Sequence, residues 1–160
     1  MNMRIGVLTI SDRSFRNERK DESGPTIIEI VKEKLGDVLQ YEVVPDEKDI
    51  IKKKIIAMID NLNIDLIFTT GGTGVSIRDV TPEATSEVGD KEVPGFAEAM
   101  RAKSFIITPH ALLSRAKAVI RKKSLIINLP GSPKAVKECL DVILPAIPHA
   151  IEVLKGQAKE

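Results

Sequence analysis

Apolar residues along the chain follow two alternating patterns. Short runs rich in β-branched residues are typical of buried strands, whereas apolar residues spaced three and four apart are typical of amphipathic helices. The runs predict strands at 4–10, 40–44, 64–69, 124–129 and, at an edge of the sheet, 118–120. The helical spacing predicts helices at 24–35, 47–62, 82–88, 96–103 and 111–116, and a long one from Pro133. Strands that alternate with helices at short intervals indicate βαβ units, so we expect a three-layer α/β fold with a mostly parallel β-sheet flanked by helices on both faces.

Residues at the ends of these segments refine the expected boundaries. Ser23, Thr81 and Ser132 each stand directly before a predicted helix, so we expect them to be N-caps. Pro145 and Pro148 fall inside the last helical pattern. Because proline interrupts the hydrogen bonding of a helix, we expect the last helix to kink or restart there.

The composition argues against several classes of protein. Of the 160 residues 42% are hydrophobic and 29% charged, which predicts a single domain over residues 1–160 that is neither disordered nor embedded in a membrane. The formal net charge of +1 argues against a nucleic-acid partner, which requires a concentrated basic face. No apolar run approaches the roughly 18 residues that span a bilayer, and residues 1–6 lack the pattern of a signal peptide. We therefore expect a cytoplasmic protein without a membrane partner.

Zinc and acyl-transfer chemistry receive no support from the sequence. His110 and His149 are far apart, with no cysteine or histidine at ligand spacing. The single cysteine, Cys139, lies at helical spacing among apolar residues and is expected to be buried. No motif marks Ser114 as a nucleophile.

Polar or glycine-rich segments follow four of the predicted strands. These segments are Ser11-Asp12-Arg13, Pro45-Asp46-Glu47, Thr70-Gly71-Gly72-Thr73-Gly74 and Pro130-Gly131-Ser132. Because open α/β sheets bind ligands just beyond the carboxyl ends of their strands, we expect the four segments to converge on one site. The charged stretch 16–22, which follows the first segment, is expected to be an exposed loop.

The glycine-rich segment 71–74 has two interpretations. Its glycines permit positive φ and close approach of a ligand, so its backbone amides and the hydroxyls of Thr70 and Thr73 suit a phosphate. An ordinary tight turn between a strand and a helix explains the same residues. Two named motifs do not fit. The lysine of a P-loop does not follow, and the dinucleotide fingerprint starting at Gly72 requires glycine or alanine where Ile77 stands, which disfavours a flavin- or dinucleotide-binding redox domain.

Two aspartates and three arginines are candidates for phosphate chemistry. Asp46 and Asp79 follow neighbouring strands, where they suit a Mg²⁺ ion that bridges phosphate oxygens. Asp46 also suits a plain N-cap of the helix at 47–62. Arg13, Arg78 and Arg115 are candidate phosphate partners, since guanidinium groups bind phosphate in a bidentate way. Exposed arginines without a specific role are the competing interpretation.

Several phrases along the chain together resemble the molybdopterin adenylyltransferases of the bacterial MogA group, and are similar to a domain of animal gephyrin and of its plant counterpart. The phrases are Thr9-Ile10-Ser11-Asp12-Arg13, Val44-Pro45-Asp46-Glu47, Thr69-Thr70-Gly71-Gly72-Thr73-Gly74, Arg78-Asp79-Val80-Thr81-Pro82-Glu83-Ala84, Pro94-Gly95-Phe96, Leu113-Ser114-Arg115 and Asn128-Leu129-Pro130-Gly131. The resemblance covers nearly the whole chain, in order and at matching spacing. One position, Ser132, differs from relatives that carry glutamine there.

The resemblance implies a molybdopterin-binding-like fold and a reaction of molybdenum cofactor biosynthesis: AMP passes from ATP to molybdopterin, with Mg²⁺ as cofactor and pyrophosphate as product. It implies catalytic roles for Asp46 and Asp79, and a homotrimeric assembly. The residues expected to bind the pterin and the nucleotide are Ser11, Asp12, Arg13, Thr70, Gly71, Gly72, Thr73, Gly74, Arg78, Ser114, Arg115, Pro130, Gly131 and Ser132. The alternative is a non-catalytic pterin-binding or scaffolding paralogue on the same fold.

Overall fold

A six-stranded β-sheet in the order β2-β1-β3-β6-β5-β4 forms the centre of the computed structural model, which describes residues 2–159. The strands are β1 (Ile5–Ile10), β2 (Val38–Val44), β3 (Leu66–Thr70), β4 (Lys91–Glu92), β5 (Ala118–Arg121) and β6 (Ser124–Leu129). Strands β1, β2, β3 and β6 are mutually parallel, β5 pairs with β6 in antiparallel fashion, and β4 pairs with β5 in antiparallel fashion. The mostly parallel sheet predicted from the sequence is confirmed.

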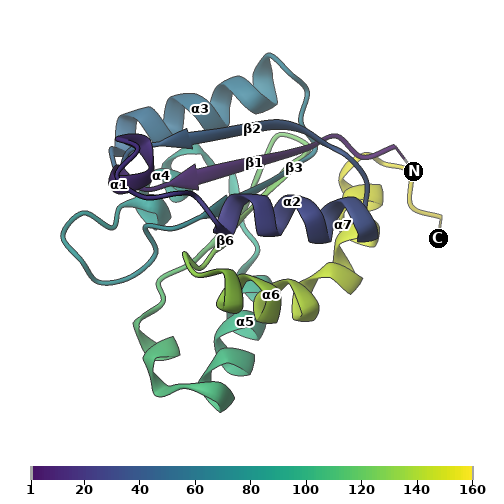
Figure 1. The fold of residues 1–160 in the computed structure, drawn as a ribbon. Helices are drawn as coiled ribbons and strands as arrows, with labels where there is room; N and C mark the ends of the chain where they lie inside the picture. Colours follow the sequence, from purple (N-terminus) through teal and green to yellow (C-terminus); the bar gives the residue numbers. More distant parts are fainter. Residues whose placement is uncertain (1, 160) are drawn as a thin grey trace.

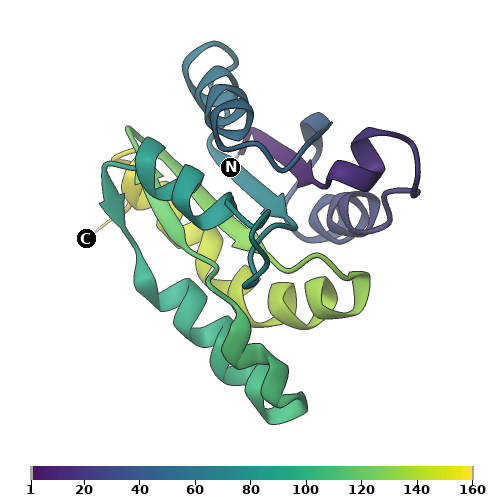
Figure 2. The same cartoon turned by 90° about the vertical axis from the view of Figure 1, so that its left-hand side faces the viewer.

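Helices cover both faces of the sheet, as Figures 1 and 2 show. They are α1 (Asp12–Phe15), α2 (Ser23–Lys34), α3 (Lys48–Asp60), α4 (Thr81–Val88), α5 (Pro94–Ile107), α6 (Pro133–Ile143) and α7 (Ile147–Leu154), with 3-10 turns η1 (Pro109–Leu113) and η2 (Leu144–Ala146). Helices α3 and α4 pack on one face, and α2, α5, α6 and α7 pack on the other.

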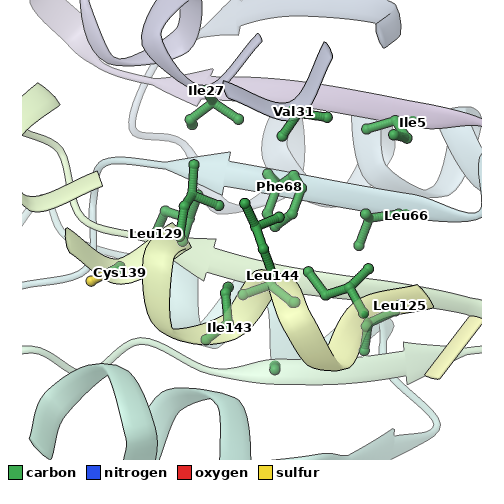
Figure 3. Close-up of a cluster of buried hydrophobic side chains, with 14 of the residues drawn as sticks. Ile5, Ile27, Val31, Leu66, Phe68, Leu125, Leu129, Cys139, Ile143 and Leu144 are labelled. Atoms are coloured by element: carbon green, nitrogen blue, oxygen red, sulfur yellow. The ribbon is translucent and has the colours of Figure 1, made fainter. Parts of the chain in front are cut away.

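Each central strand contributes side chains to both faces, because successive residues of a strand point in opposite directions. In β3, Leu66 and Phe68 join the cluster beneath α2 and α6, which Figure 3 shows, while Ile67 joins the cluster beneath α3. All three side chains are fully buried. Burial on both faces explains why the central strands form continuous apolar runs in the sequence.

Four local expectations differ from the structure. Segment β5 is not an edge strand, because the two-residue strand β4 pairs with it and forms the edge. Ser23 is already helical, and Glu22 holds the cap position of α2. Thr81 is also not a cap, since its buried hydroxyl donates to the Gly71 carbonyl at 2.9 Å. The helix expected at 111–116 is instead the 3-10 turn η1.

Two other expectations are confirmed at the carboxyl-terminal end. The Ser132 hydroxyl caps α6 by accepting from the Ala135 amide at 3.2 Å. The predicted interruption of the last helix occurs at η2, after which α7 begins. Within residues 2–159, none of the helices has the length and apolar character needed to cross a bilayer.

Candidate functional site

The carboxyl ends of β1, β2, β3 and β6 meet at one edge of the sheet and surround a cavity of about 210 Å³, which we call the polar cavity. In Figure 1 this is the edge at which the arrowheads of β1 and β2 lie, beside α1. A segment after each of the four strands contributes to the lining: Ser11 follows β1, Asp46 follows β2, Gly71 and Gly72 follow β3, and Gly131 follows β6. Asp79 lines the same cavity.

Asp46 is held in place by the neighbouring strand end. Its Oδ2 accepts from the backbone amide of Asp12 at 2.8 Å, and its own amide donates to Oδ1 of Asp12 at 3.0 Å. The cap position of α3 belongs to Glu47, so the interpretation of Asp46 as an N-cap is wrong. The other carboxylate oxygen of Asp46 faces Gly72, where an added Cβ would lie 3.1 Å from Oδ1.

The polar cavity disfavours negative charge on Asp46. Burial raises the pKa of Asp46, and the nearby carboxylates of Asp12 and Asp79 raise the same pKa further, while the hydrogen bond from the Asp12 amide opposes the rise. A divalent cation would relieve this repulsion. Mg²⁺ takes carboxylate oxygens and keeps several water or phosphate ligands, so the pair Asp46 and Asp79 fits it. Within residues 2–159 there is no group of three or more acidic, histidine or cysteine side chains that would form a closed metal cage.

The turn after β3 requires glycine at two positions. Gly71 has φ 95° and Gly72 has φ 67°, a region that other residues rarely adopt. A Cβ on Gly71 would also collide with the Ile10 carbonyl oxygen. The turn is fixed on two sides, because the Gly71 amide donates to the Leu129 carbonyl at 3.3 Å and the Thr81 amide donates to the Gly72 carbonyl at 3.1 Å. A rigid turn of this kind brings backbone close to a ligand.

The two threonines of the glycine-rich segment lie differently with respect to the polar cavity. The Thr70 hydroxyl donates to the Pro130 carbonyl at 2.6 Å, which ties the turn after β3 to the turn after β6. Thr73 is buried and does not line the polar cavity. Thr70 itself lines the polar cavity, with its hydroxyl proton directed at Pro130.

Arg78 and Arg115, which both follow the glycine-rich segment in the chain, bind carboxylates. Arg78 donates to both oxygens of Asp12 at 3.0 Å and to Glu47 at 2.9 Å. Arg115 donates to both oxygens of Glu83, and also to the Gly74 carbonyl at 2.7 Å and the Asp79 carbonyl at 2.8 Å. Neither guanidinium lines the polar cavity. Arg115 therefore clamps the segment 74–79 from outside.

The basic side chains that line the polar cavity differ from the three arginines predicted to bind phosphate. Arg13, like Arg78 and Arg115, does not line the polar cavity, whereas Arg19 and Lys20 do. Both belong to the stretch 16–22, which we expected to be only an exposed loop. The position of the stretch in the chain points to them, because it joins α1, which follows the end of β1, to the start of α2.

A second cavity, of about 270 Å³, lies among α5, η1 and α6, and we call it the apolar cavity. Met100, Leu113 and Cys139 are among its lining residues, together with Ser114. Cys139 is buried as predicted, and this burial raises the pKa of its thiol. Gly74 and Pro130 also line the apolar cavity, while Gly71 and Gly131 line the polar one. The turns after β3 and β6 thus stand between the two cavities.

The fold and the polar cavity define an α/β protein whose candidate ligand site lies beyond the carboxyl ends of parallel strands. The family described as probable molybdopterin binding domain matches residues 6–149. The chain belongs to this family.

Individual relatives agree with this assignment. Molybdopterin adenylyltransferase of Helicobacter pylori strain J99 is 50% identical over 154 residues, which cover 95% of this chain and 88% of that protein. Gephyrin of Dictyostelium discoideum is 46% identical over 165 residues, or 97% of this chain and 23% of gephyrin. The crystal structure of the molybdopterin biosynthesis enzyme MoaB from Thermus thermophilus is similar with a TM-score of 0.92 and 46% identity, and the match covers 99% of this chain and 100% of that one.

Proposed function

We propose that this chain is a molybdopterin adenylyltransferase, which transfers AMP from ATP to the terminal phosphate of molybdopterin and releases pyrophosphate. The observation that carries the proposal is the placement of Asp46 and Asp79 in one cavity beside the glycine turn at residues 71–72. Further support comes from relatives of that name at 40–50% identity over nearly the whole chain.

The reaction requires no nucleophilic side chain. A terminal phosphate oxygen of the pterin attacks the α-phosphorus of ATP, and the bond from that phosphorus to the bridging oxygen of the β-phosphate breaks. Pyrophosphate leaves with the bonding electron pair. Because the attacking phosphate is already anionic, the protein acts by positioning the two substrates and by balancing their charge.

In this proposal, the residues of the polar cavity have separate roles in binding phosphate and in binding Mg²⁺. Backbone groups of Gly71 and Gly72 approach the phosphates closely, because no side chain stands in the way. Asp46 and Asp79 hold Mg²⁺ in this proposal, and the bound ion would neutralise charge on the triphosphate. Asp12 fixes the orientation of the Asp46 carboxylate through its backbone amide.

The apolar cavity takes the planar ring of a substrate in this proposal. The surface of this cavity is mostly apolar, and polar groups at its lining come from Ser104 and Ser114 as well as from Arg101, His110 and Glu138. Such a lining suits a flat heterocycle with a few polar groups. The turns after β3 and β6 line both cavities, which supports a ring on one side of these turns and the phosphates on the other.

We further propose that the chain assembles as a homotrimer. The carboxyl-terminal end of α5 and the turn η1 project beyond the sheet in Figures 1 and 2. This projection exposes the large apolar side chains Phe105, Ile106, Ile107, Leu112 and Leu113. Contiguous apolar side chains of this kind mark interaction surfaces.

Because ATP is the adenylyl donor, the cytoplasm is the compartment proposed for the reaction.

The test is release of pyrophosphate from ATP by the purified protein with Mg²⁺, measured with and without molybdopterin. The proposal predicts release only when molybdopterin is present, together with formation of the adenylylated pterin. Binding of molybdopterin without any release of pyrophosphate would instead favour a non-catalytic pterin-binding paralogue.

A further inference from the structure

The polar cavity needs positive charge if it is to accept phosphate groups, since Asp46 and Asp79 both line it. Arg78 and Arg115 do not meet this need, because each is paired with carboxylates and lies outside the cavity lining. Among the lining residues of the polar cavity, the basic side chains are those of Arg19 and Lys20.

Asp21 anchors the segment that carries these two cations. Its carboxylate accepts hydrogen bonds from the Thr9 hydroxyl at 2.7 Å, the Gly24 amide at 3.2 Å, the Ser23 hydroxyl at 3.3 Å and the Tyr41 hydroxyl. Burial, together with the bond to Asp21, raises the pKa of Tyr41, so the phenol remains a donor at neutral pH. The anchor joins β1, β2 and the start of α2, and it fixes the backbone directly after Arg19 and Lys20 at the rim of the cavity.

The two cations are free to bind a ligand. Arg16, in the same segment, forms a two-pronged ion pair with Glu18. Arg19 and Lys20 take part in none of the ion pairs among residues 2–159. Both side chains are exposed, the Asp21 carboxylate has its own set of donors, and Glu22 lines the polar cavity beside the two cations without an ion pair to either of them.

We propose that Arg19 and Lys20 bind phosphate groups of the substrate in the polar cavity. A guanidinium offers a planar fork for two phosphate oxygens and an ammonium offers a compact point charge, so the pair suits a polyphosphate. The identity of the substrate rests on the proposed function, and the phosphate comes either from the triphosphate of ATP or from the terminal phosphate of the pterin.

Binding of inorganic pyrophosphate in the presence of Mg²⁺ tests the inference without any chemistry. Titration calorimetry is carried out on the wild type, the double variant Arg19→Ala/Lys20→Ala and the control Arg16→Ala, whose side chain lies outside the cavity lining. We expect roughly ten- to hundredfold weaker binding in the double variant and unchanged binding in the control. Equal affinity in all three proteins, or no binding by the wild type, would overturn the inference.

Steady-state kinetics then separates the two sources of phosphate. A raised KM for ATP with a nearly unchanged KM for molybdopterin assigns the pair to the triphosphate, and the reverse assigns it to the pterin phosphate. The swapped variant Arg19→Lys/Lys20→Arg keeps both charges and should recover most of the affinity. If the wild type binds pyrophosphate through these residues but transfers no adenylyl group, the proposed function fails while the inference stands. Unchanged KM values for both substrates in the double variant would contradict the inference that Arg19 and Lys20 bind substrate phosphate.

Discussion

The backbone amides of Asp12 and Asp46 each donate to the carboxylate of the other residue, at 2.8 Å and 3.0 Å. This reciprocal pair joins the ends of β1 and β2 and leaves one oxygen of Asp46 directed at Gly72. Asp12 is held in turn by Arg78, whose hydrogen bonds lower the pKa of Asp12. Asp12 therefore acts on the polar cavity through Asp46 and does not line it.

The first prediction concerns this positioning role. Asp12→Ala removes the acceptor of the Asp46 amide and frees Arg78, so we expect kcat to fall about ten- to hundredfold with a smaller change in KM. Asp12→Asn keeps an oxygen for the Asp46 amide and should retain most of the activity. The measurement is steady-state release of pyrophosphate by both variants. An equal fall in kcat in both variants would show that activity depends on the charge of Asp12 and not on its hydrogen bond to the Asp46 amide.

Gly24 allows the Asp21 anchor to form. A Cβ at this position would lie 2.6 Å from the Thr9 hydroxyl oxygen and would also collide with the Asp21 carboxylate. We expect Gly24→Ala to lower the free energy of unfolding by about 1–3 kcal/mol and to weaken pyrophosphate binding, because the anchor must shift. Gly95→Ala is the matched control, since a Cβ there meets nothing within 4 Å and the position lies in helix α5. Denaturant unfolding of both variants checks the prediction, and similar stabilities would refute the role given to Gly24.

The sequence predicted the layers of the fold well because burial leaves a strong periodic signal. In the helix predicted at 47–62, the apolar positions Ile51, Ile55, Met58 and Ile59 are buried, whereas Leu62 lies beyond the end of α3 and is exposed. Strand β6 begins and ends where its apolar run does. Strand β4 escaped prediction because two exposed residues carry no periodicity, so its pairing with β5 depends on tertiary context. The caps of α2 and α4 were assigned wrongly because Ser23 and Thr81 bond elsewhere.

The site was predictable only in part. The segments after the four parallel strands meet because strand direction places their ends at one edge. The partners of individual side chains could not be predicted, because they depend on distances across the fold. Arg78 pairs with Asp12, which is 66 positions away in the chain, and Ser114 lines the apolar cavity instead of the polar one. Arg19 and Lys20 were not predicted to line the polar cavity, because a charged loop has no sequence pattern that distinguishes binding residues from solvated ones.

A pH-dependent contribution to stability is expected from Glu83. Hydrogen bonds from Arg115 lower the pKa of Glu83 below its ordinary value of 4.5. A lowered pKa in the folded state means that the ion pair stabilises the protein fully above pH 4.5 and that this stabilisation is lost as the pH falls through the folded-state value. Because the pair is partly exposed, we expect Glu83→Gln to cost up to about 1 kcal/mol at pH 7 and less as the pH is lowered below 4.5. Unfolding free energies of both proteins across this range provide the check, and a difference that grows toward low pH would contradict the assignment.

The proposed trimer predicts that a charged residue introduced on the exposed surface of α5 lowers the mass of the particle in solution. Ile106 is 83% exposed, so Ile106→Asp should leave the fold intact while placing a charge in the proposed interface. We expect light scattering to give three times the chain mass for the wild type and the chain mass for the variant. Val153→Asp, at an exposed position of α7, should remain a trimer. A wild type of monomeric mass would rule out the assembly.

The shared cavity of Asp46 and Asp79 is tested most directly by the Mg²⁺ dependence of pyrophosphate release in Asp46→Asn and Asp79→Asn, measured alongside molybdopterin binding. Both side chains face the space in which the triphosphate is proposed to lie. We expect turnover to fall about a hundredfold or more, a higher Mg²⁺ requirement, and pterin affinity close to that of the wild type. Loss of pterin binding in step with turnover, at an unchanged Mg²⁺ requirement, would contradict a metal-holding role for the two aspartates.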